Sequence, residues 1–172
     1  GIGLIRDLEQ NLDANLKNKK ILLIGAGGAA EGVIYSILET KPLELTLTNR
    51  TIEKSNMIQN KIHVHAKNFG VNLNVIEFAK LPQQYFDVII NATSASLNNA
   101  HLGIDNKIFH DKCLAYDMMY GKETPFMKQA LSQHARTSDG LGMLVEQAAE
   151  AFYIWHHIKP HTKSVINFFR KK

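Results

Sequence analysis

The sequence predicts an α/β fold in which helices cover both faces of one doubly wound, mostly parallel sheet. Three observations support this expectation. The chain has 172 residues, which is enough for one well-buried core and too few for two ordinary domains. Short apolar runs alternate with helical patterns, and the first of these runs is apolar throughout, as in a strand buried on both faces. Because right-handed crossovers place helices on both faces of a sheet, we expect three layers, α-β-α, in a single domain over 1–172.

The chain starts with the pattern of an amphipathic helix over residues 4–16. The apolar residues at helical spacing are Leu4, Ile5, Leu8, Leu12 and Leu16. A helix with one apolar face needs a partner surface, so we expect this helix to pack on the domain or on a neighbouring one.

The first half of the chain then predicts the order β-α-β-α-β. An apolar run at 20–24 ends directly in glycines, which is typical of a strand at the centre of a parallel sheet. The elements that follow are a helix at 28–39, a strand at 43–48, a long helix at 52–69 and a strand at 73–76.

The second half continues the alternation. We expect strands at 86–90, 113–117 and 136–138, and helices at 125–134, 142–157 and 162–169. The polar segment 93–104 is expected to be a surface loop. The terminal helices, at about 3–16 and 162–170, would flank the domain.

Charge and hydropathy exclude several classes of partner. The net charge of +4 comes from scattered Lys and Arg, and the one dense basic run, 170–172, is typical of a solvated helix end. No apolar run approaches the roughly 18 residues that a membrane span needs. We therefore expect neither a nucleic-acid partner nor a membrane span.

The cysteine and histidine residues indicate, less strongly, the cellular compartment and whether a metal site is expected. The single Cys113 lies in an apolar stretch, where a small hydrophobic residue of a strand is expected rather than a nucleophile. One cysteine forms no internal disulfide, which favours a reducing compartment, the cytoplasm. The eight His have no repeated ligand spacing with acids or Cys, so we expect no metal site.

A glycine-rich segment follows the first strand and precedes a helix, the context that a dinucleotide-binding loop requires. Gly25 allows a tight turn, Gly27 lets the backbone approach a pyrophosphate, and Ala30 permits close helix-strand packing. The helix N-terminus offers N–H groups to the phosphates. A merely structural turn is the alternative. The residues of the segment are Gly25, Ala26, Gly27, Gly28, Ala29 and Ala30.

The end of the second strand indicates which dinucleotide is bound. NAD-binding domains present Asp or Glu to the ribose about 20 residues after the loop, whereas Thr48, Asn49, Arg50 and Thr51 stand here. Asn49 and Thr51 offer neutral hydrogen bonds, Arg50 can stack on adenine or bind a phosphate, and Lys54 adds a second charge. This pattern predicts NADP. The alternative is a surface Arg beside a helix cap formed by Asn49 or Thr51.

Six segments, in order along the chain, carry a resemblance to a known family. They are Gly-Ala-Gly-Gly-Ala at 25–29, Thr-Asn-Arg-Thr at 48–51, Ile-Ile-Asn-Ala-Thr-Ser at 89–94, Tyr-Asp-Met-Met-Tyr at 116–120, Thr-Pro-Phe at 124–126 and Asp-Gly-Leu-Gly-Met-Leu-Val-Glu-Gln-Ala at 139–148. With these segments the chain resembles shikimate dehydrogenase. The resemblance implies a Rossmann domain and NADPH-dependent reduction of 3-dehydroshikimate to shikimate in aromatic amino-acid biosynthesis. The segment 95–99 departs from the family pattern, in which a Gly often follows the serine.

The resemblance also implies roles for individual residues. Residues 25–29 would hold the pyrophosphate, and the 2′-phosphate of the adenosine would lie among Asn49, Arg50, Thr51 and Lys54. The further positions are Thr93 on the adenosine side, Met118, Gly140 and Met143 around the nicotinamide, and Tyr120 and Gln147 toward the substrate. From the residues alone, the Met side chains can equally fill the core, Gln147 can face solvent, Asp139 and Gly140 can form a simple turn, and Asp117 can make a local cap or salt bridge.

The catalytic residues implied by the family have no match in this chain. The resemblance assigns proton donation to a Lys and an Asp of a preceding substrate domain, and Gly1-Ile2-Gly3-Leu4 resembles the segment directly after that Asp. We therefore expect this chain to bind NADP(H), to share shikimate or 3-dehydroshikimate with an N-terminal domain, and to turn over negligibly alone. The alternatives are a quinate-preferring or dual-specificity dehydrogenase and a stand-alone NADP-binding module. The oligomeric state stays open.

Overall fold

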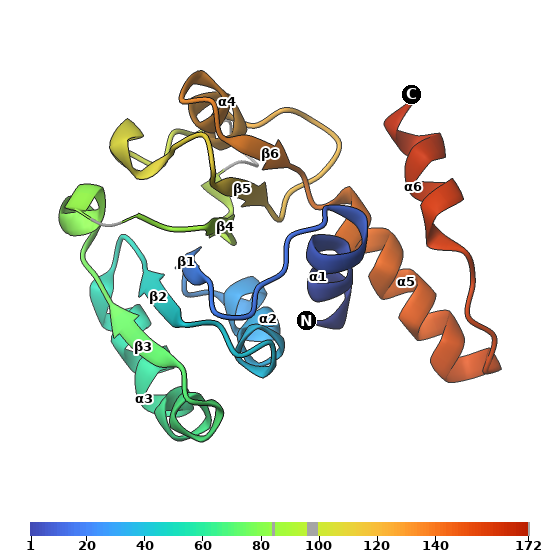
Figure 1. Cartoon of the computed structure of the whole chain (residues 1–172), viewed down its shortest axis with the longest axis horizontal. Coiled ribbons are helices and arrows are strands. Elements are labelled where there is room, and N and C mark those ends of the chain that lie inside the picture. The colour runs from blue at the N-terminus through green and yellow to red at the C-terminus, as the bar shows by residue number, and fades with distance from the viewer. Residues whose placement is uncertain (84, 96–99, 172) are drawn as a thin grey trace.

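The centre of the molecule is a six-stranded parallel sheet in the order β3-β2-β1-β4-β5-β6 (Figure 1). The computed structural model describes residues 1–83, 85–95 and 100–171. All five strand pairings are parallel, and the order reverses between β1 and β4, as in a doubly wound sheet. The strands are β1 (Lys20–Ile24), β2 (Glu44–Thr48), β3 (Asn72–Val75), β4 (Val88–Asn91), β5 (Leu114–Asp117) and β6 (Arg136–Ser138).

Helices cover both faces of this sheet. One core cluster joins α1, α2, α3 and α5 to the sheet, and a second joins α4 and two short 3-10 helices to the opposite face. The helices are α1 (Ile2–Arg6), α2 (Gly28–Glu39), α3 (Ile52–Phe69), α4 (Pro125–Ser132), α5 (Leu141–His156) and α6 (Thr162–Arg170), with the π-helix η1 (Asp7–Asn11) and the 3-10 helices η2 (Phe78–Gln83) and η4 (Asn106–Ile108).

Alternate residues of β1 explain why the sheet is buried on both sides. Ile21 and Leu23 belong to the first cluster, whereas Leu22 and Ile24 belong to the second, and all four are fully buried. The side chains of a strand point alternately to opposite faces, so an apolar run of this kind needs helices on both. The three-layer α/β fold expected from the sequence is confirmed.

The leading helix is shorter than the spacing predicts, and the expectation of a helix over 4–16 is wrong beyond residue 11. Helix α1 passes into the single π-helical turn η1, in which Leu12 donates its N–H to the Asp7 carbonyl at 3.0 Å. Asp13 then adopts a left-handed conformation with φ of 52°, which ends the helical run. Leu16 is buried, as expected of an apolar face, but it lies in the irregular segment that leads to β1.

The remaining boundaries agree with the sequence to within about two residues. The expected elements at 20–24, 28–39, 52–69 and 136–138 have the observed limits. The 3-10 helix η2 was not expected; it contributes the buried Leu81 to the second cluster. Residues 96–99 of the expected polar loop lie outside the described residues. Cys113 is buried beside the start of β5, where burial raises the pKa of its thiol.

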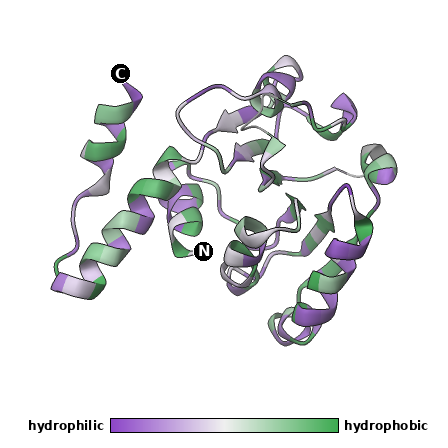
Figure 2. Cartoon of the chain, turned by 180° about the vertical axis from the view of Figure 1, so that it is seen from behind, coloured by the Kyte–Doolittle hydropathy of each residue, from purple (hydrophilic) through white to green (hydrophobic). Residues whose placement is uncertain are grey.

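Helix α6 packs on α5 at the edge of the molecule, and its Ile166 is only 3% exposed. Figure 2 shows hydrophilic and hydrophobic residues alternating along the outer helices, as expected of helices with one buried face. Within the described ranges, no helix is both long enough and apolar enough to cross a membrane.

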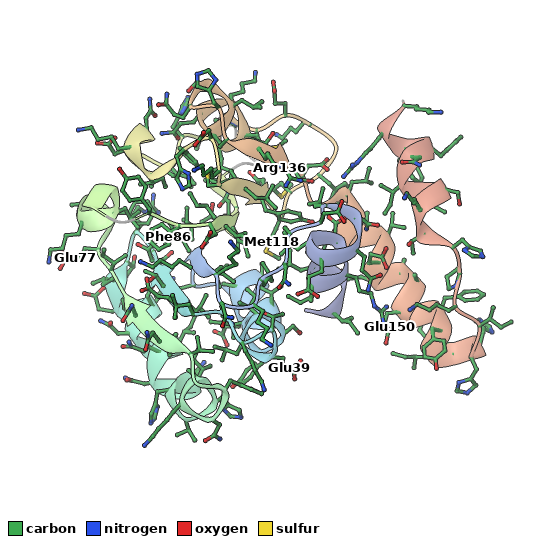
Figure 3. All side chains as sticks on the ribbon, viewed as in Figure 1. Glu39, Glu77, Phe86, Met118, Arg136 and Glu150 are labelled. Carbon is green, nitrogen blue, oxygen red and sulfur yellow. The ribbon has the colours of Figure 1, made fainter. Side chains whose placement is uncertain are left out.

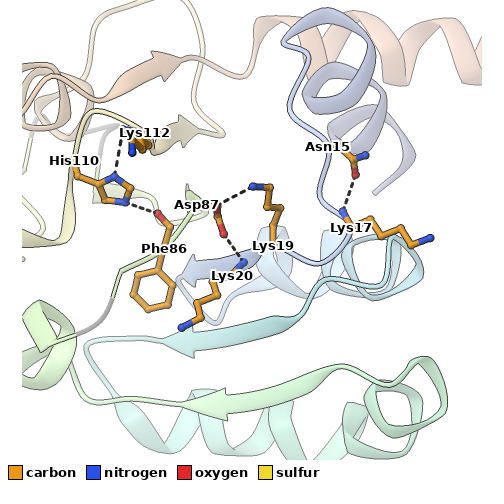
Figure 4. Close-up of polar contacts among 8 residues, drawn as sticks. All are labelled: Asn15, Lys17, Lys19, Lys20, Phe86, Asp87, His110 and Lys112. Atoms are coloured by element: carbon orange, nitrogen blue, oxygen red, sulfur yellow. Dashed lines mark hydrogen bonds and ion pairs between the residues drawn. The ribbon is translucent and has the colours of Figure 1, made fainter.

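Asp87 ties the start of β4 to the start of β1 (Figure 4). Its carboxylate accepts the backbone N–H of Lys20 at 2.9 Å and lies 3.1 Å from the Lys19 ammonium. At the far edge of the sheet, the Arg136 guanidinium donates to the Leu12 carbonyl at 2.8 Å, so the segment before β1 is held beside β6.

Candidate dinucleotide-binding site

The loop between β1 and α2 makes a turn that accepts only glycine at its first position. Gly25 has φ of +115°, and its N–H donates to the Thr48 carbonyl at 2.8 Å. A Cβ at this position would lie 3.1 Å from the Ala92 backbone and 3.2 Å from the Thr93 methyl. Both the backbone conformation and the close approach of β4 therefore require a residue without a side chain.

The next two glycines leave open space in front of the helix. Among the described residues, no atom outside the adjoining backbone lies within 4 Å of a Cβ built on Gly27 or Gly28, and no side chain hydrogen-bonds to the N-terminus of α2. Ala30 is fully buried against the sheet. Free N–H groups at an open helix start fit a pyrophosphate, which needs several donors and close approach of the backbone.

Two cations follow β2, the strand next to β1, with Arg50 in the connection to α3 and Lys54 in the first turn of α3. Arg50 and Lys54 are exposed, and neither forms an ion pair with another described residue. Asn49 donates its side-chain N–H to the Thr51 carbonyl at 2.9 Å. Thr51 precedes α3 but its side chain makes no capping hydrogen bond, so the alternative of a cap formed here is not supported. The two positive charges are free to meet an anion.

Thr93 is held beside the glycine loop by Asn91, the last residue of β4. Asn91 is fully buried, and its side-chain oxygen accepts the Thr93 N–H at 3.1 Å and the Thr93 hydroxyl at 2.8 Å. Since the Thr93 methyl approaches Gly25, the ends of β1 and β4 meet where α2 begins.

Asp117, the last residue of β5, connects the end of β4, the start of α4 and the turn after β5, and sequence reasoning assigned it only a local role. Its buried carboxylate accepts from the Asn91 amide at 3.0 Å, the Thr124 hydroxyl at 2.7 Å and the Met119 N–H at 3.0 Å. Thr124 in turn caps α4 by accepting the Met127 N–H at 3.2 Å. The signal available in the sequence was a polar residue ending each of two adjacent apolar strands.

Met118, Gly140 and Met143 gather where β5 ends and α5 begins. The Met118 N–H donates to the Asn91 carbonyl at 3.0 Å, and its side chain packs at the edge of the first core cluster (Figure 3). Gly140 donates to the Met119 carbonyl at 2.8 Å, and any side chain on Gly140 would collide with the Met118 carbonyl. Met143 is buried in the first turn of α5.

The two residues expected to face the substrate, Tyr120 and Gln147, contact different parts of the protein. Tyr120 is 49% exposed, on the turn that Asp139 holds by accepting the Gly121 N–H at 3.2 Å. Gln147 packs its side chain against Gly3 of α1, so it is exposed but not free of the protein. No hydrogen bond joins these two described residues.

No group of three or more His, Cys, Asp or Glu side chains that could hold a metal occurs among the described residues. The features with which to compare known proteins are thus a glycine-rich loop before α2, the exposed cations Arg50 and Lys54, and the buried polar contacts at the ends of β4 and β5.

Family models match most of the chain in two segments. Residues 7–105 match the family described as shikimate / quinate 5-dehydrogenase, and residues 140–167 match the shikimate 5′-dehydrogenase C-terminal domain. The chain belongs to the shikimate/quinate 5-dehydrogenase family.

Relatives and solved structures agree with this family. A shikimate dehydrogenase (NADP(+)) of Methylobacillus flagellatus is 48% identical over 99% of this chain and 62% of the relative, and one of Legionella pneumophila is 45% identical over 99% and 61%. An Ael1 enzyme from Pseudomonas putida superposes with a TM-score of 0.91 at 42% identity, over 98% of this chain and 61% of that one. Shikimate dehydrogenase from Aquifex aeolicus gives 0.82 at 29%, over 99% and 60%. The chain spans about three-fifths of the length of these relatives.

Proposed function

We propose that this chain is the NADP(H)-binding domain of an NADP-dependent shikimate dehydrogenase. The whole enzyme would reduce 3-dehydroshikimate to shikimate reversibly, in the cytoplasm, on the route to aromatic amino acids. The observation that carries this proposal is the open glycine loop before α2, which follows β1 at the same end of the sheet at which β2 leads to the exposed cations Arg50 and Lys54. Relatives that share 43–48% of this sequence are named shikimate dehydrogenase (NADP(+)).

The adenosine half of the cofactor would be held by backbone donors and by charge. The N–H groups of residues 25–29 would bind the pyrophosphate, and Thr93 would border the adenosine. Arg50 and Lys54, assisted by Asn49 and Thr51, would surround the 2′-phosphate. Hydrogen bonds to charged groups contribute about 1.5 to 3 kcal/mol each, so these contacts suffice to select NADP over NAD.

The nicotinamide half would lie against Met118, Gly140 and Met143. Because Gly140 has no side chain and Met143 is buried in α5, these residues would offer the ring a bare backbone surface and an apolar side chain. Bound NADPH supplies the hydride for ketone reduction. Tyr120 and Gln147 would donate to and accept from the hydroxyls of the substrate.

The domain organisation follows from the same proposal. Residues 1–172 would form one NADP-binding domain that shares its substrate with a domain outside this chain. The family resemblance assigns the proton donor, a Lys and an Asp, to that other domain. We therefore expect the isolated chain to bind NADP(H) and to reduce 3-dehydroshikimate negligibly.

Calorimetric titration of the chain with NADP⁺ and with NAD⁺, at one fixed salt concentration, tests the proposal. We expect a single site that prefers NADP⁺ by at least about tenfold, the effect of one charged hydrogen bond. Equal affinities would refute the assignment of Arg50 and Lys54, and absence of binding to either would refute the cofactor site itself.

Quinate is the second candidate substrate, because the description of the matched family names both shikimate and quinate. Oxidation of each compound by the enzyme that contains this domain, with NADP⁺ and then NAD⁺, separates the two. Preference for quinate with NAD⁺ would favour the second candidate.

A further inference from the structure

A buried carboxylate from the start of the chain lies against the first turn of α5. Asp7 is fully buried, and one of its oxygens accepts the Tyr116 hydroxyl at 2.7 Å. The other accepts the Asn11 amide at 3.0 Å. The carboxylate also fills the space in front of Gly142, where a side chain would collide with it.

This contact links three elements that border the nicotinamide end of the crevice. Tyr116 precedes Asp117 at the end of β5, and the Met143 backbone N–H points at the Tyr116 hydroxyl oxygen. Gly142 and Met143 form the first turn of α5, directly after Gly140. Asp7 itself opens the π-helical turn η1, a type of helix that occurs often at functional positions.

The first turn of α5 has no strong cap of its own. Its N-cap residue, Gly140, has no side chain, and Asp139 accepts the Leu141 N–H at a long 3.4 Å. A negative charge near the first turn is favoured by the helix dipole and by the free N–H groups. The Asp7 carboxyl group, from another element, lies beside this turn in front of Gly142.

We infer that Asp7 is a positioning residue for the nicotinamide half of the cofactor site: acting through Tyr116 and Gly142, it sets the position of Gly140 and Met143. The inference rests on the proposed binding of NADP(H). Within the described part of the chain, Asp7 forms no hydrogen bond with the glycine loop, Arg50 or Lys54, so we expect the adenosine half of the site to be independent of it.

The Asp7 carboxyl group is held by two hydrogen-bond donors. Burial raises the pKa of Asp7, and the hydrogen bonds from Tyr116 and Asn11 oppose that rise. Both oxygens accept hydrogen bonds, so an amide nitrogen would face a donor at the Asn11 position and would reverse the hydrogen bond at the Tyr116 position, where the hydroxyl can also accept. Asp7→Asn thus disturbs the contact without changing its size.

Two ligands separate the halves of the site. NADP⁺ occupies both, whereas adenosine 2′,5′-bisphosphate carries the 2′-phosphate, the adenosine and one 5′-phosphate without the nicotinamide. For the unmodified chain we expect tighter binding of NADP⁺. For Asp7→Asn we expect the affinity for NADP⁺ to fall about tenfold, the scale of a small displacement of a binding group, with the affinity for the bisphosphate unchanged within about twofold.

The matched control is Glu150→Gln, which breaks the 2.6 Å ion pair between Arg6 and Glu150. This pair joins α1 to α5, whereas the Asp7 contact joins the adjoining η1 to α5, and Glu150 lies two turns beyond Gly142 along α5. We expect no change in the affinity for either ligand. A second variant, Tyr116→Phe, should reproduce the selective loss seen with Asp7→Asn, and the double variant should lose no more than either alone.

The outcomes are distinct. Binding of neither ligand to the unmodified chain would refute the proposed function. If that chain binds both ligands equally, if Asp7→Asn weakens both alike, or if Glu150→Gln gives the same selective loss, the positioning role is overturned while cofactor binding stands. Thermal unfolding accompanies each titration, and failure of both Asp7→Asn and Tyr116→Phe to fold would assign the cluster a purely structural role and overturn the inference.

Discussion

The Asp7 carboxylate occupies the space that a side chain at position 142 would need. Gly142 is glycine in this chain because a carboxylate from a residue 135 positions earlier stands where its Cβ would be. The requirement comes from packing against another element and not from the backbone conformation of α5, in which alanine is the better helix former.

We predict that Gly142→Ala lowers the free energy of unfolding by about 2 to 3 kcal/mol, the usual cost of an extra group in a filled site. Asp7→Ala should also destabilise, because it leaves the Tyr116 hydroxyl without its buried acceptor. The double variant should lose clearly less than the sum of the two losses, because Asp7→Ala removes the carboxylate that a methyl group at position 142 would meet. Urea unfolding measures all three.

The control for this cycle is Gly32→Ala in α2, where nothing lies within 4 Å of a built Cβ. Gly32 is exposed in the interior of a helix, so alanine there should stabilise by about 0.5 to 1 kcal/mol. Additive losses for Gly142→Ala and Asp7→Ala would show that the two residues do not compete for one space.

Arg50→Gln should weaken binding of NADP⁺ by about 10- to 100-fold and leave NAD⁺ binding almost unchanged, because only the 2′-phosphate needs the charge. Lys54→Gln should act in the same direction. Both losses should shrink as salt is raised, since the cations are exposed. Isothermal titration at two salt concentrations provides the comparison.

Lys61→Gln is the matched control, because Lys61 lies on the same helix but pairs with Glu31 at 3.4 Å. It carries the same net change in charge. An equal effect of Lys61→Gln on NADP⁺ affinity would mean that the general positive potential matters, and not a specific 2′-phosphate contact.

Thr124→Val should lower the free energy of unfolding by about 2 to 4 kcal/mol, because it removes both the cap of α4 and a hydrogen bond to the buried Asp117. Thr124→Ser keeps both groups and should lose less than about 1 kcal/mol, the cost of one methyl. Thermal or urea unfolding distinguishes the two variants. A larger loss for Thr124→Ser than for Thr124→Val would indicate that packing of the methyl group, which Val retains, dominates at this position.

The Asp87 carboxylate should stabilise the folded state at neutral pH and lose this contribution in acid. Burial alone would raise the pKa of this carboxyl, but the Lys20 N–H and the Lys19 ammonium outweigh it and hold the pKa below its ordinary value of 3.8 (Figure 4). Since the pKa is lower in the folded state, the contribution is present above pH 3.8 and is lost as the pH falls through the lowered value.

Asp87→Asn should therefore destabilise by about 1 kcal/mol at pH 7, a modest amount because the ion pair is partly exposed. The difference from the unmodified chain should shrink in acid. Urea unfolding at pH 7 and near pH 3 measures this change. A loss that stays constant between the two conditions would show that the charge of Asp87 is not responsible.

Local patterns were sufficient to predict most of the sheet and its helices. Apolar runs such as 20–24 identify strands because both faces are covered, and glycine 70, in a left-handed conformation, marks the end of α3 where a helical pattern stops. The loop at residues 25–28 was also predictable, because one short segment contains the tight turn, the open space in front of the helix and the start of the helix.

Contacts between distant segments could not be predicted in this way. The helical spacing of Leu8, Leu12 and Leu16 continues past residue 11, but Asp13 ends the helix, and burial of Leu16 is achieved outside it. Spacing also gives no sign that Asp7 meets Tyr116 or that Asn91 meets Asp117, because each pair forms only when separate strands and helices have assembled.

The order of the strands has one more consequence, for encounters between copies of the chain. An open sheet ends in two strands with unpaired backbone groups, here β3 and β6. These edges have four and three residues, β3 presents exposed Asn72 and Asn74, and β6 begins with an Arg whose guanidinium binds the neighbouring Leu12 carbonyl. Short edges with polar and charged side chains are poor templates for a further strand. The sheet is thereby protected against edge-to-edge aggregation while both of its ends remain open.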